Sequence, residues 1–156
     1  MSKRLSVMKH FQTIKPLLDF GEAVHHQAGL ERPMVELMLL RVSQINGCAY
    51  CLDMHSKDAR AAGEIEQRLY LVSGWREAGS LYSDRERAAL AWGEAVTRLG
   101  EHGVSDDVYE LARAAFSEEE LVNLTLLVGL INTWNRINVA FQTPAGSYKS
   151  PVKQAA

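Results

Sequence analysis

The chain has 156 residues, 47% of them hydrophobic and 23% charged, so it is long enough to bury the core of one globular domain. Its formal net charge of −2, without any block of Lys and Arg, gives no reason to expect a nucleic-acid partner. The longest apolar stretch, 121–134, is too short and too polar to span a bilayer, and the N-terminus lacks the apolar segment of a signal peptide. We therefore expect a cytoplasmic protein with no membrane partner.

The first half of the chain has the pattern of helices, and no segment alternates apolar and polar residues as a strand would. Gly29, Gly47 and Gly63 stand where the first three helices are expected to stop. The first predicted helix has Pro16 in its first turn and runs to about Gln27. The next three run from Pro33 to Asn46, from about Cys48 to Ala62 and, shorter, from Glu64 to about Ser73.

Serine residues mark the helix starts in the second half. Ser83 and Ser117 each begin a capping-box pattern, with a glutamate three residues later, and Ser105 precedes a helix expected to reach Phe116. The last helix, expected to end near Gln142, is apolar nearly all round, which indicates burial in the centre of the fold or between subunits.

These elements predict an all-α fold: a compact helical bundle with a CxxC motif at the N-terminus of a central helix. We expect one helical domain over 1–142. The tail, 143–156, contains Pro, Gly, Ser and Lys and is expected to be loose or to form an interface arm.

Two cysteines and a histidine share one face of the third predicted helix. Cys48, Cys51 and His55 are spaced i, i+3 and i+7, which places all three side chains on the same side of a helix. Both cysteines fall in its first turn, where unpaired backbone N–H groups and the helix dipole favour a thiolate. We therefore expect a reactive dithiol, with His55 available to exchange a proton.

Glu36 lies on the preceding helix, in an otherwise apolar segment from Pro33 to Leu40. If the two helices form an antiparallel hairpin about Gly47, Glu36 and His55 lie at roughly 16 and 12 Å from the turn, near enough to meet. The carboxylate could then orient the imidazole, and the imidazole could take the thiol proton. A carboxylate among apolar residues also needs such a partner.

Other interpretations of these residues remain open at this point. The cysteines could be small buried residues without reactivity, or the four residues could form a zinc site. A structural disulfide is disfavoured because a CxxC bridge closes a very short loop, and a thioredoxin-like motif would need strands. Asn135, Arg136 and Asn138 are polar on an apolar helix, and we expect them to hydrogen-bond across helices or subunits rather than to catalyse.

The spacing of the four residues resembles a known signature. Glu36, eleven residues, Cys48-Ala-Tyr-Cys51, three residues and His55 are similar to the E-x11-C-x2-C-x3-H pattern of AhpD-like alkylhydroperoxidases, in the carboxymuconolactone decarboxylase superfamily. The resemblance covers roughly 30–141. It departs at Tyr50, where the best-studied members have a histidine.

The resemblance implies an all-helical fold, assembly into trimers or hexamers, and thiol-dependent reduction of hydroperoxides. It implies that Cys51 is the peroxidatic cysteine, that Cys48 resolves it in a redox-active disulfide, and that Glu36 and His55 form the proton relay. The partners would be a hydroperoxide and an external thiol or dithiol reductant, with no metal and no bound cofactor. Two alternatives remain: a thiol–disulfide reductase or redox adaptor without peroxide turnover, and a non-catalytic helical scaffold.

Overall fold

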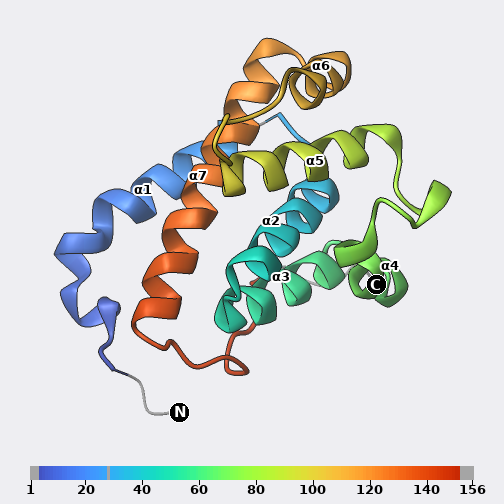
Figure 1. The fold of residues 1–156 in the computed structure, drawn as a ribbon. Helices are drawn as coiled ribbons and strands as arrows, with labels where there is room; N and C mark the ends of the chain where they lie inside the picture. The colour runs from blue at the N-terminus through green and yellow to red at the C-terminus, as the bar shows by residue number, and fades with distance from the viewer. Residues whose placement is uncertain (1–3, 28, 152–156) are drawn as a thin grey trace.

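The computed structural model describes residues 4–27 and 29–151. The secondary structure of these residues is helical and includes no strand, which confirms the predicted all-α class (Figure 1). The α-helices are α1 (Phe11–Gln27), α2 (Arg32–Asn46), α3 (Ala49–Ala61), α4 (Glu66–Leu71), α5 (Asp84–Arg98), α6 (Asp106–Ala115) and α7 (Glu118–Ala140). Short 3-10 helices are η1 (Val7–His10), η2 (Val72–Gly74) and η3 (Gly79–Leu81).

The serine caps behave as predicted at two of three positions. Ser83 and Ser117 each form a complete capping box, in which the serine hydroxyl and the glutamate carboxylate accept from each other's backbone N–H groups. Ser105 stands at the N-cap of α6, but its side chain makes no capping hydrogen bond.

The start of α1 differs from the prediction. The helix begins at Phe11, five residues before Pro16, and continues directly from the 3-10 turn η1. The extra turn places Ile14 in the core, where only 9% of it is exposed. Proline inside the helix removes one backbone hydrogen bond. Burial of the apolar face compensates for that loss.

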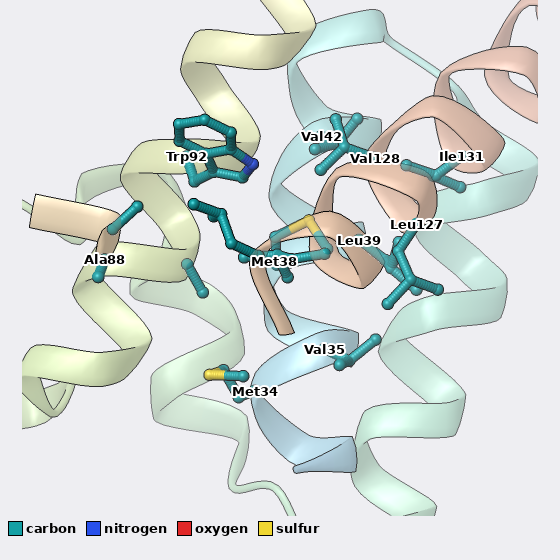
Figure 2. Close-up of a cluster of buried hydrophobic side chains, with 14 of the residues drawn as sticks. Met34, Val35, Met38, Leu39, Val42, Ala88, Trp92, Leu127, Val128 and Ile131 are labelled. Carbon is teal, nitrogen blue, oxygen red and sulfur yellow. The ribbon is translucent and has the colours of Figure 1, made fainter. Parts of the chain in front are cut away.

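The central helix is α2, which packs against α3, α5 and α7 (Figure 1). Its side chains Leu37, Met38 and Val42 are completely buried. Figure 2 shows the cluster on one side of α2, where Met38 and Val42 lie among side chains of α5 and α7, including Trp92, Leu127 and Val128. A helix that is apolar on several faces is stable only where neighbours cover all of them.

The long helix α7 lies between α1 and α2, and contacts both (Figure 1). Its inner face is buried, but three apolar side chains on its outer face are 39–59% exposed: Val122, Leu126 and Val139. The prediction that this helix is buried on most sides therefore holds only in part within one chain. No helix in the described part of the chain has both the length and the apolar character needed to cross a membrane.

A close approach between α2 and α5 depends on Gly93. A methyl group added there would lie 2.9 Å from Cγ of the fully buried Met38. We expect Gly93→Ala to lower the free energy of unfolding by about 1–2 kcal/mol, since overpacking outweighs the gain in helix propensity. Urea denaturation measures this directly.

Gly129 on α7 provides the matched control, because nothing lies within 4 Å of a methyl group added there. Gly129→Ala should raise the free energy of unfolding by about 0.5–1 kcal/mol. Equal effects of the two substitutions would contradict the close packing of α5 on α2.

Candidate active site

The turn between α2 and α3 is short and tightly bonded. Gly47 ends α2 in the left-handed conformation, with φ of 66°, and its N–H donates to the Gln44 carbonyl. The N–H of Cys48 then donates to Ser43. This is the conformation that glycine adopts most readily at the end of a helix. The two helices pack against each other directly after it, in the hairpin that the sequence suggested.

Cys48 is the N-cap residue of α3, and its sulfur accepts a hydrogen bond from the backbone N–H of Cys51 at 3.3 Å. The two cysteines are joined as a disulfide, with their Cα atoms 5.4 Å apart, and each is only 1% exposed. The predicted placement of the CxxC motif at the N-terminus of a helix is confirmed. In the described part of the chain, no three His, Cys, Asp or Glu side chains are placed to hold a metal ion.

The structure brings Glu36 and His55 together across the hairpin. His55 Nδ1 lies 2.9 Å from Glu36 Oε2, and both residues are 5% exposed. A carboxylate accepts hydrogen bonds, so the tautomer with its proton on Nδ1 donates to Glu36. In that tautomer Nε2 is an acceptor. It is buried and has no hydrogen-bond partner among the residues that the structure describes.

A cavity of about 390 Å³ opens beside these residues. Cys51, His55 and Tyr50 line it from α3, whereas Cys48 is not among its lining residues. The remaining wall is largely apolar and comes from η1, α1, α2 and α7, including Val7, Met8, Leu17, Leu18, Leu39, Leu127, Leu130, Ile131 and Trp134. A substrate in this cavity would meet Cys51 and His55 in surroundings that favour apolar groups.

Asn138 of α7 also reaches this site, which the sequence interpretation did not foresee. Its Nδ2 lies 3.5 Å from the Cys51 sulfur, and it lines the same cavity. Polar residues on an apolar helix predict that a partner exists but do not identify it. Asn135 does bond across helices as expected, to Ser43 and Asn46, while Arg136 bonds within α7.

The described part of the tail, 143–151, packs on α3 of the same chain. Lys57 donates to the Tyr148 carbonyl at 2.9 Å, and the Tyr148 hydroxyl donates to the Asp58 carboxylate at 2.9 Å. Burial, this hydrogen bond and the charge of Asp58 all raise the pKa of Tyr148. Residues 152–156 lie outside the described residues, and a role of the tail as an interface arm stays a prediction.

Comparison with known protein families identifies the family of this chain. A model of the carboxymuconolactone decarboxylase family matches residues 13–95, more than half of the chain. The chain belongs to this family. The matched region includes α2 and α3, and therefore Glu36, both cysteines and His55.

Two proteins resemble the chain along nearly its whole length. The uncharacterized protein YdfG of Bacillus subtilis is 40% identical over 148 residues, which are 94% of this chain and 99% of that one. ATU0492 of Agrobacterium tumefaciens is a protein of unknown function for which an AhpD-type role in antioxidant defence has been suggested. Its crystal structure superposes with a TM-score of 0.88 at 42% identity, over 94% of this chain and all of that one.

The AhpD-like fold extends to more distant proteins. The debrominase Bmp8 superposes with a TM-score of 0.79 at 17% identity, over 90% of this chain and 75% of that one. At this identity the likeness shows a shared fold and no more. Because one fold can carry different reactions, the reaction of this chain has to be argued from its own site.

The contact between Tyr148 and Asp58 can be tested by removing one hydroxyl. Tyr148→Phe leaves the buried Asp58 carboxylate without this donor, so we expect the free energy of unfolding to fall by about 1–2 kcal/mol. Limited proteolysis should also cut the tail faster. Tyr70→Phe is the control, because Tyr70 is 67% exposed and its loss should change stability little. A tail that is cut at the same rate in wild type and Tyr148→Phe would argue against the contact.

Proposed function

We propose that this chain is a thiol-dependent peroxidase that reduces hydroperoxides through Cys48 and Cys51, as in AhpD-like alkylhydroperoxidases. The observation that carries the proposal is that Cys51 and His55 line one cavity while Glu36 holds the other side of the His55 ring. This is the arrangement of a nucleophile, a base and a group that orients the base.

The oxidative half of the cycle starts from the reduced dithiol. His55 Nε2 takes the proton of the Cys51 thiol, and Glu36 stabilises the imidazolium that forms. The thiolate attacks one oxygen of the peroxide, so an S–O bond forms and the O–O bond breaks. His55 returns the proton to the leaving oxygen, which departs as an alcohol or water. Cys51 is left as a sulfenic acid.

The reductive half returns the site to its starting state. The Cys48 thiol condenses with the sulfenic acid, releasing water and forming the disulfide. An external thiol or dithiol then reduces it and leaves as its own disulfide. The electrons thus pass from the reductant to the peroxide through the two cysteines, and we propose no further cofactor.

We also propose that the protein works in the cytoplasm as a homo-oligomer, a trimer or a hexamer. The exposed apolar side chains on the outer face of α7, Val122 and Leu126 among them, support an assembled state because they would be covered in an oligomer.

Serine substitutions separate the two cysteines. Cys51→Ser should abolish peroxide consumption with a dithiol reductant, because no sulfenic acid can form. Cys48→Ser should permit one oxidation per chain and then stop, because the sulfenic acid has no resolving thiol. Serine is a good N-cap residue, so the start of α3 should survive the second change.

The outcomes of this assay also separate the alternatives. Peroxide consumption by both variants at the wild-type rate would refute the proposal. Wild-type protein that reduces disulfides but consumes no peroxide would be a thiol–disulfide reductase. Thiols that react with iodoacetamide no faster than free cysteine near neutral pH would indicate a non-catalytic scaffold.

The role of Glu36 predicts a separate effect. Glu36→Gln keeps an oxygen that can accept from Nδ1 but removes the charge that stabilises the imidazolium. We expect peroxide turnover to fall about 10–100-fold with the melting temperature little changed. Glu118→Gln, at a carboxylate 88% exposed on α7, should match wild type in both measurements. Failure of Glu36→Gln to fold would make Glu36 a structural residue instead.

A further inference from the structure

The two sulfurs of the CxxC pair have different hydrogen-bond donors. At the start of α3, the backbone N–H of Cys51 donates to the Cys48 sulfur, 3.3 Å away. This donor from the helix terminus, which the sequence pattern offered to both cysteines, therefore serves Cys48. The Cys51 sulfur receives its donor from another helix, since Asn138 Nδ2 of α7 lies 3.5 Å from it.

The surroundings of Asn138 make this contact significant. Asn138 is 8% exposed and Cys51 is 1% exposed, so bulk water does not compete strongly for either group. The backbone carbonyl of Asn138 accepts from the Thr143 N–H at 3.0 Å, which fixes the end of α7. The amide is also uncharged, so it can donate at any pH at which the protein is folded.

We propose that Asn138 is a catalytic residue that holds the Cys51 thiolate by an N–H···S hydrogen bond. Its use in turnover rests on the proposed peroxidase function. When His55 takes the Cys51 proton, the sulfur becomes an anion and the same amide N–H donates to it more strongly. Hydrogen bonds to charged acceptors are about twice as strong as those between neutral groups.

The amide therefore favours the thiolate over the thiol and the disulfide. It places no charge of its own in the apolar cavity. It also raises the fraction of Cys51 thiolate through a contact separate from the helix terminus, which is engaged with Cys48. As the S–O bond forms and the peroxide O–O bond breaks, negative charge leaves the sulfur for the departing oxygen, and the amide hydrogen bond weakens accordingly.

The test measures the thiolate itself and needs no peroxide. In reduced protein with Cys48→Ser, Cys51 is the single cysteine, and its alkylation by iodoacetamide rises with pH as the thiolate forms. Adding Asn138→Ala should move the midpoint of this curve up by about one pH unit, a roughly tenfold loss of thiolate at lower pH. The rate at the high-pH plateau should stay close to that of the parent.

A second variant separates loss of the hydrogen bond from a general effect of misfolding on the midpoint. Asn138→Asp keeps the shape but places a carboxylate beside the sulfur, so its midpoint should rise further than that of Asn138→Ala. Asn135→Ala is the matched control, because Asn135 is a buried amide on the same helix that bonds to Ser43 and Asn46 instead. It should lower the melting temperature and leave the midpoint unchanged.

Midpoints equal to the parent's in both Asn138 variants would overturn the proposal, as would an equal shift in Asn135→Ala. Peroxide turnover, measured separately on wild-type protein, keeps the two hypotheses apart. A shifted midpoint without turnover would retain the role of Asn138 as thiolate donor and refute the peroxidase. Turnover with an unshifted midpoint would support the peroxidase and refute the role of Asn138 as thiolate donor.

Discussion

The candidate site depends on one contact across a helical hairpin, between Glu36 of α2 and His55 of α3. The contact forms because Gly47 turns the chain within two residues, so that α3 returns along α2 with its cysteines at the turn. Both partners are almost fully buried, and a buried carboxylate without a partner would cost several kcal/mol. The hairpin thus gives the Glu36 carboxylate a buried partner in His55, in addition to the Arg32 guanidinium of its own helix, whose Nε lies 3.8 Å from Glu36 Oε1.

The position of α7 is set by paired amides and not only by apolar packing. Asn46, just before the turn, donates to both Asn132 and Asn135, and Asn135 donates to Ser43. Apolar side chains can slide past one another at small cost, whereas paired amides define one register because any shift leaves a polar group unsatisfied. Asn138 lies one turn beyond Asn135 and makes a contact of its own with the Cys51 sulfur, and the Asn46–Asn132 pair holds α7 in register independently of Asn135.

Features that depend on residues close together in the chain could be predicted from the sequence. The helix periods, the two capping boxes and the i, i+3, i+7 spacing each involve residues within two turns, and the Glu36 contact needed only the added assumption of a hairpin. The predicted start of α1 was wrong because burying the apolar residues before Pro16, such as Ile14, stabilises the helix more than the proline destabilises it.

Contacts between distant parts of the chain could not be predicted in this way. Asn138 is 87 residues from Cys51, and Tyr148 is 90 residues from Asp58. Glu94 is a further case: it is 2% exposed and accepts from Arg41, Arg76 and Trp75. Burial raises its pKa, but those hydrogen bonds outweigh burial and hold the pKa below its usual value. Nothing in the local pattern distinguishes Glu94 from a solvated helix residue.

Access to the cavity also bears on how the two cysteines divide their roles. The two cysteines are equally buried, but of the pair only Cys51 is among the described residues that line the cavity. A peroxide or a reductant that enters there meets Cys51 first, whatever the relative basicity of the two thiols. Cys48, whose sulfur accepts from the Cys51 N–H at the helix start, does not line this cavity. Under the proposed cycle, the order of attack follows from which sulfur faces the cavity, and the hydrogen bonds to each sulfur adjust the rates within that order.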